Sequence, residues 1–163
     1  MNAGRVVPLA LIATIVVIGT GAALVPVPFL SLEVAGRETL HLALPADGEF
    51  EYRYRHSVYD ALVDERYRVD ADGMLQLEIE SADRRALEYY GLSSEPELRG
   101  STFVIPGNPE PIPRIALIVL RQQQQSVLVG ARRFDLSTEL GDARLVLRPV
   151  RITRLASLFA ATR

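Results

Sequence analysis

The sequence predicts a mainly β protein: an N-terminal transmembrane helix, an antiparallel β-sandwich or barrel of about nine short strands, and a short C-terminal helix. Three observations lead to this fold class. Residues 6–25 are almost all aliphatic, alanine or glycine. From Glu33 onward, apolar and polar residues alternate with a period of two. Turn signals such as Asp72-Gly73 separate the alternating segments.

These patterns divide the chain into five parts. They are a cytoplasmic N-terminus (1–5), a transmembrane anchor (6–25), an exit linker (26–32), an extracytoplasmic β domain (33–150) and an amphipathic C-terminal helix (151–163).

The anchor is predicted from length and charge. No charged residue occurs from Val6 to Leu32, and a helix of about 20 residues spans the hydrocarbon core of a bilayer. Arg5 and the amino terminus precede the helix, so the positive-inside bias places the N-terminus in the cytoplasm and the β domain outside. A cleaved signal peptide is the alternative, with small residues at 21–23 as the cleavage site. The apolar run exceeds the roughly 7–15 residues of such peptides and favours a retained, single-pass anchor in the cell membrane.

The alternation of apolar and polar residues predicts the strands of the β domain. Strands are expected within residues 39–44, 50–58, 63–69, 74–79, 114–120, 126–129, 132–136 and 143–150. Residues 83–88 favour a helical turn, and the proline-rich segment 106–113 favours a loop. The apolar run 114–120 suggests a strand buried on both faces. The predicted C-terminal helix either caps the core or rests on the membrane surface.

Composition excludes several functions. The chain of 163 residues has no cysteine, two histidines and a net charge of -2. It therefore lacks the cationic field that attracts nucleic acid and a metal-spaced cluster of ligands. There is also no phosphate-binding loop and no nucleophile elbow. Ser57 directly follows His56, and strand alternation would put the two on opposite faces. We therefore predict no enzyme activity, no metal and no cofactor.

One constellation has chemical content. If residues 59–62 form the loop of a hairpin, Val58 pairs with Val63 and His56 lies opposite Glu65. The same register puts Tyr54 opposite Tyr67 on this aromatic face. The candidate ligand-binding or structural polar residues are His56, Glu65, Tyr54, Tyr67 and Ser57. The pair is interpreted either as a ligand-binding or acid/base site or, preferably, as a buried polar pair that locks the register.

The other face of the predicted hairpin gathers basic residues. They are Arg53, Arg55, Arg66 and Arg68. Like charges directly opposite each other are unfavourable, so the cluster is either a solvated face or a docking surface for an anionic partner.

The order of these features resembles a known family. Gly48-x-Phe50, Tyr54-x-His56-Ser57-Val58 and the downstream Glu65 are similar to the family called domain of unknown function 1850. The segments 114–120, 127–130 and 141–147 resemble its closing strands, so the likeness covers about residues 40–150. The family's central glycine-rich loop is reduced here to Gly91-Leu92.

The resemblance implies a function. Members of that family often accompany the membrane subunits of tripartite ATP-independent periplasmic transporters (TRAP) of the TAXI class. The expected function is therefore a membrane-anchored extracytoplasmic accessory module that contacts the transporter membrane subunit or its solute-binding protein. The alternative is a stand-alone module that binds a small ligand on the face carrying His56 and Glu65.

Overall fold

A computed structural model describes residues 26–91 and 94–153. Residues 28–150 form one compact unit, to which the following account refers. Of a second unit, residues 1–27 and 151–163, only the outer ends of two strands are described. The predicted anchor (6–25) lies outside the described residues and stays a prediction. Among the residues that are described, no helix is long and apolar enough to cross a membrane.

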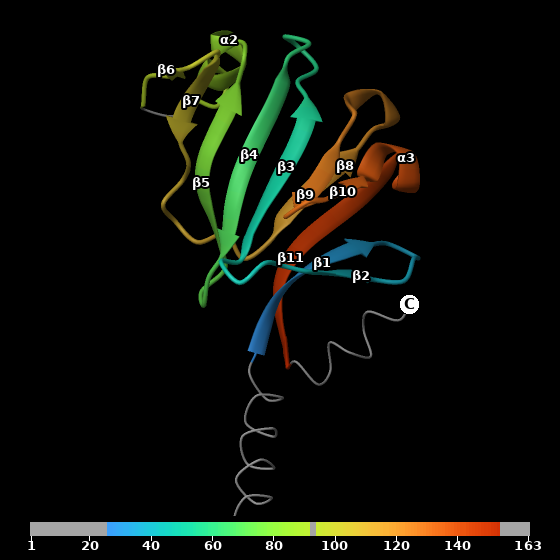
Figure 1. The fold of residues 1–163 in the computed structure, drawn as a ribbon. Coiled ribbons are helices and arrows are strands. Elements are labelled where there is room, and N and C mark those ends of the chain that lie inside the picture. The colour runs from blue at the N-terminus through green and yellow to red at the C-terminus, as the bar shows by residue number, and fades with distance from the viewer. Residues whose placement is uncertain (1–25, 92–93, 154–163) are drawn as a thin grey trace, which may run out of the picture. The chain divides into compact units, whose positions relative to one another are not determined.

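The protein is mainly β, with two sheets, as predicted (Figure 1). The four-stranded sheet has the order β2 (Leu40–Ala43), β1 (Pro26–Val34), β11 (Ala143–Thr153), β8 (Ile115–Val119). The seven-stranded sheet has the order β10 (Arg132–Asp135), β9 (Ser126–Val129), β3 (Glu49–Arg55), β4 (Leu62–Val69), β5 (Met74–Ser81), β7 (Thr102–Pro106), β6 (Glu97–Arg99). Three short helices, α2 (Arg84–Glu88), η2 (Arg121–Gln123) and α3 (Leu136–Leu140), lie in the connections.

The main core is shared by the two sheets. Leu30, Leu145 and Leu147 come from the smaller sheet, and Phe50 and Val127 come from the larger one; all are buried in one cluster. Alternation along each strand sends these residues inward and their neighbours outward. The architecture is therefore two packed sheets, the sandwich alternative of the prediction.

Helix α2 is held by a second, smaller cluster. Asp83 caps its N-terminus by accepting a hydrogen bond from the Arg85 backbone N–H at 2.9 Å. Ala86 and Leu87 are buried against residues of β4, β5 and β7. The predicted helical turn at 83–88 is thus confirmed, and its docking fixes the segment that follows it.

The predicted register of β3 against β4 is wrong. Tyr52 lies opposite Glu65, and pairing ends at Arg55 opposite Leu62. Residues 56–61 form a longer loop than expected, in which Asp60 adopts a left-handed conformation (φ 51°). At the other end, Gly48 approaches the Val69 backbone too closely for any side chain, which fixes the same register.

The electrostatics of the outer face account for this register. Arg53 lies opposite Asp64, where the predicted register would have placed Arg68. Glu51 and Glu49 likewise lie opposite Arg66 and Arg68. Opposite charges therefore face each other across the strands. The shift is an even number of residues, so each side chain keeps its predicted face.

Three other expectations need correction. Residues 26–32 are not a linker, because they belong to β1. Residues 151–153 continue β11 and are not helical, and the rest of the predicted C-terminal helix lies outside the described residues. Strand β8 is at the edge of its sheet and is not buried on both faces, since Ile118 is 64% exposed.

The register can be tested by a double-mutant cycle. Arg53→Gln and Asp64→Asn should show a favourable coupling of about 0.5–1 kcal/mol in the free energy of unfolding measured with urea, because the half-buried pair is broken by either change. The control cycle combines Arg53→Gln with Arg68→Gln. A repulsive coupling between these two arginines, with none between Arg53 and Asp64, would restore the register predicted from sequence.

Candidate ligand pocket

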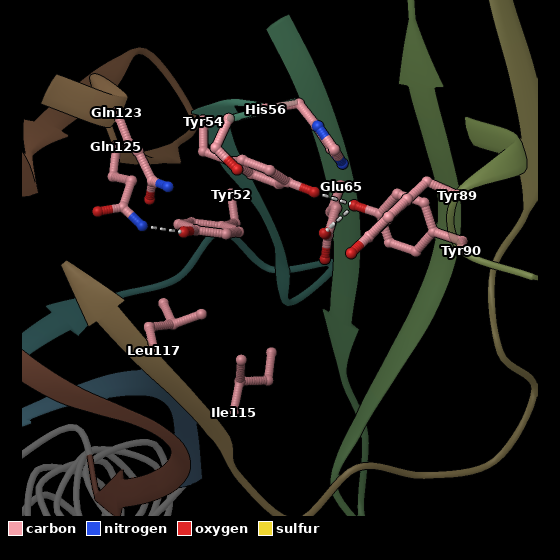
Figure 2. Close-up of a pocket in the computed structure, with 11 residues that line it drawn as sticks. Tyr52, Tyr54, His56, Glu65, Tyr89, Tyr90, Ile115, Leu117, Gln123 and Gln125 are labelled. Atoms are coloured by element: carbon pink, nitrogen blue, oxygen red, sulfur yellow. Dashed lines mark hydrogen bonds between the residues drawn. The ribbon is translucent and has the colours of Figure 1, made fainter. Parts of the chain in front are cut away.

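A cavity of about 490 Å³ lies between the two sheets (Figure 2). Strands β3 and β4 form one wall, β8 forms another, and the segments around α2 and η2 complete it. The lining residues are Tyr52, Tyr54, His56, Ser57, Glu65, Tyr89, Tyr90, Ile115, Leu117, Gln123 and Gln125. Tyr89 is 66% exposed, so the pocket reaches the surface there. Its size is in the range of small-molecule sites.

Alternation along β3 builds the aromatic wall. Tyr52 and Tyr54 point to the same face, and their rings stack with centroids 5.2 Å apart. His56 comes next, in the loop, and its ring contacts Tyr59 and the edge of Tyr89 at centroid distances of 5.2 and 5.0 Å. The sequence prediction of an inward aromatic face is confirmed.

Glu65 is the centre of a buried hydrogen-bond network. One carboxylate oxygen accepts hydrogen bonds from the Tyr67 hydroxyl and, at 3.2 Å, from the Gln76 amide. The other oxygen accepts one from the Tyr90 hydroxyl. Because Tyr90 donates its single proton to Glu65, the Tyr54 hydroxyl is the donor in its contact with Tyr90. The chain of donors runs from Tyr54 through Tyr90 to the carboxylate.

The tyrosines of this network stay protonated. Burial, followed by the negative charge of Glu65, raises the pKa of Tyr54, Tyr67 and Tyr90 well above the usual range. Burial also raises the pKa of Tyr52, against the opposing effect of a hydrogen bond from Gln125. All four phenols are therefore neutral donors at physiological pH.

The Tyr52 hydroxyl oxygen accepts a hydrogen bond from a fixed amide. The Gln125 amide nitrogen donates to the Tyr52 oxygen at 2.8 Å. The amide is held in this orientation because its oxygen accepts from the Leu120 N–H and its nitrogen also donates to the Ile118 carbonyl. The Tyr52 oxygen is thus an acceptor towards Gln125, and its own proton is directed elsewhere.

His56 is fixed as a neutral donor. Its Nδ1 accepts a hydrogen bond from the Val58 backbone N–H at 3.2 Å. A nitrogen that accepts carries no proton, so the ring proton lies on Nε2. The side chain is 6% exposed, and it lines the pocket.

The predicted pairing of His56 with Glu65 is not formed. The two side chains line the same pocket, but Glu65 takes its hydrogen bonds from Tyr67, Tyr90 and Gln76. Tyr67 lies behind the carboxylate, stacked on Phe50 at 5.2 Å.

Ser57 lines the pocket beside His56, whereas strand alternation had predicted opposite faces. Strand β3 ends at Arg55, so both residues belong to the loop that follows and the alternation rule does not hold for them.

The four arginines lie on the opposite face, as expected, but are mostly paired with acids. Arg53 binds Asp64 and, at 3.1 Å, Glu51. The remaining pairs are Arg66 with Glu78, Arg55 with Asp60 at 3.2 Å, and Arg68 opposite Glu49 in the ladder. Acidic side chains therefore offset the like charges on this face, and docking of a partner through these arginines stays a prediction.

Sequence patterns did not identify three residues of the site. Tyr90 and Gln125 reach it from segments outside β3 and β4, and no local pattern marks them. Gln76 lies opposite Tyr67 on β5, after a register shift between Arg66 and Tyr67 that the regular alternation does not predict. Within residues 26–91 and 94–153, no group of three His, Asp or Glu side chains could hold a metal ion.

Comparison with known proteins gives no relative. The chain matches no family model, and it has no match among curated proteins or among solved structures. The resemblance to the domain of unknown function 1850 family therefore stays a prediction.

The network predicts which residues are energetically coupled. Glu65→Gln should destabilise the domain by about 1–3 kcal/mol, because an amide cannot accept all three donors. In double-mutant cycles followed by urea unfolding, Glu65→Gln and Tyr90→Phe should be non-additive by about 1 kcal/mol. Glu65→Gln and His56→Ala should be nearly additive. Strong coupling to His56 with none to Tyr90 would show that the carboxylate bonds the imidazole instead.

Proposed function

We propose that this domain is a small-ligand-binding module. The observation that carries the proposal is the cavity of about 490 Å³ between the sheets, with aromatic walls and a few fixed polar groups. Aromatic and aliphatic walls supply contact area, and convergent polar groups supply orientation. Tyr52, His56 and Glu65 line the cavity and supply a hydroxyl, an imidazole N–H and a carboxylate.

Binding is a better account of this site than catalysis. The His56 Nδ1 is occupied by a backbone N–H, which leaves a neutral donor and no free base at that nitrogen. The Glu65 carboxylate is immobilised by three donors. Groups held in this way orient a ligand, whereas a general base must be free to take a proton.

The buried polar network itself supports a ligand site. Removing a carboxylate and an imidazole from water costs stability unless every group is satisfied. An apolar interior of the same shape would avoid that cost. Because these polar groups do not favour folding, their position around a cavity is better explained by recognition of a ligand.

We propose that this module lies outside the cytoplasm, on the retained N-terminal anchor that the sequence predicts. A role beside a TRAP transporter of the TAXI class is the second candidate. One observation favours contact with a partner protein: Val58, Leu62 and Tyr89 are 64%, 44% and 66% exposed. Val58 lies in the loop that bears His56, and Tyr89 lines the pocket. Exposed apolar side chains beside a pocket are suited to contact with a partner protein that delivers or receives the ligand.

The binding function can be tested by blocking the pocket. Leu117→Trp fills the cavity from β8, and the matched control Ile118→Trp adds the same bulk to the exposed face of that strand. The full-length chain is purified gently from membranes and examined by native mass spectrometry for a bound small molecule. Wild type and Ile118→Trp should carry it, and Leu117→Trp should lose it.

The proposal fails if all three proteins carry the same molecule in equal amount, or if no wild-type preparation carries one. Circular dichroism of each variant checks that the fold is retained.

A further inference from the structure

The charge of Glu65 lacks a cationic partner. The carboxylate is 8% exposed, and its three hydrogen bonds come from the neutral side chains of Tyr67, Tyr90 and Gln76. In the described part of the chain, none of the ion pairs includes it. Its neighbour Asp64, on the opposite face, does hold an arginine. Buried carboxylates are normally paired with a cation, so this one is incomplete.

The rest of the pocket lining is neutral. No arginine is among the residues that line it. Burial raises the pKa of Tyr52, Tyr54 and Tyr90 and keeps these phenols protonated, and the ring proton of His56 lies on Nε2 because its Nδ1 accepts a hydrogen bond. The lining therefore carries one net negative charge, in a setting where low polarity strengthens electrostatic interactions. An anionic ligand would be repelled, and a cationic one attracted.

Glu65 also has room for one more donor. A carboxylate oxygen accepts about two hydrogen bonds. One oxygen already has two, from Tyr67 and Gln76, and the other has one, from Tyr90. The Tyr54 hydroxyl also interacts with this carboxylate, although it donates its proton to Tyr90. An N–H of a ligand can take the remaining position, next to the Tyr54 hydroxyl. A bare metal ion does not fit, because the described residues offer no group of three ligands.

The walls suit an organic cation. The stacked rings of Tyr52 and Tyr54 lie on one side, Tyr90 donates to Glu65, and Tyr89 lines the same pocket beside His56 (Figure 2). Aromatic faces attract ammonium groups through their quadrupoles. The aliphatic side chains of β8 offer an apolar surface for the body of a ligand.

We infer that the pocket binds a small organic cation, an ammonium with at least one N–H directed at Glu65 and an apolar body packed against β8. This inference rests on the proposed binding function and names its ligand class.

The test compares three probes with one carbon skeleton: 3-phenylpropylammonium, 3-phenylpropan-1-ol and 3-phenylpropionate. Each is titrated into the full-length protein in detergent, and the shift in thermal unfolding temperature is measured. The cation should stabilise the protein saturably at millimolar concentration, at least about tenfold more tightly than the alcohol, and the anion should not stabilise it. Leu117→Trp should abolish the effect, and Ile118→Trp should retain it.

Glu65→Gln should weaken binding of the cation by at least about tenfold while leaving the alcohol unchanged. If that variant does not fold, the comparison of the three probes on wild-type protein decides alone. Binding of the anion equal to that of the cation, or no response to the cation up to the order of 10 mM, overturns the inferred ligand class. The proposed binding function fails separately, when Leu117→Trp and wild type carry the same co-purified molecule.

Discussion

The antiparallel register of β3 and β4 is the constraint on which both faces of the larger sheet depend. Setting Tyr52 opposite Glu65 brings the carboxylate beside the aromatic wall on the inner face. The same register sets Arg53 opposite Asp64 on the outer face. A slip by one residue would exchange the two faces and bury the charges. The four-residue slip predicted from the sequence would keep the faces but set Arg53 against Arg68 and Arg55 against Arg66. The charge ladder and the pocket are thus consequences of one pairing.

Glu65 then connects three consecutive parts of the chain, β4, β5 and the segment after α2. Its donors come from its own strand, from Gln76 on β5 and from Tyr90 after α2. The hydrogen bond from Tyr54 to Tyr90 links β3 to the same segment. Since α2 is five residues long and packs against a small cluster, these bonds add to the contacts that hold its C-terminal end. The geometry of the pocket and the docking of α2 are therefore supported by the same interactions.

Features set by residues close together in the sequence could be predicted, whereas features set by distant residues could not. Alternation is local, so the faces of β3 and β4, the inward tyrosines and the hairpin at Asp72-Gly73 were all predicted correctly. The register of β3 and β4 depends on the loop that joins them. The residue types in 56–61 did not predict the left-handed conformation of Asp60. The position of β8 at an edge is likewise set by sheet order, which an apolar run cannot reveal.

The partners of the polar groups were the hardest part to predict. A buried carboxylate needs hydrogen-bond donors, and the register predicted from the sequence made His56 the donor to Glu65. Of the actual donors, Tyr90 is brought in by the packing of α2, and Gln76 by the pairing of β5 with β4, in which it lies opposite Tyr67. Gln125 reaches Tyr52 across 73 residues of sequence. Reasoning from the strands alone could establish that Glu65 needs partners, but not which partners it has.

The cavity lies where two apolar clusters of the interior meet. The described residues have two apolar clusters, one between the sheets and one beneath α2. Tyr54 packs against both, so the pocket that it lines lies where the two clusters meet. Neither cluster fills this junction, and polar side chains from both sides converge there. Closing it with aliphatic residues would favour folding, whereas the chain keeps a carboxylate, an imidazole and protonated phenols around an open space. The stability lost at this junction is the strongest physical reason to regard it as the functional part of the domain.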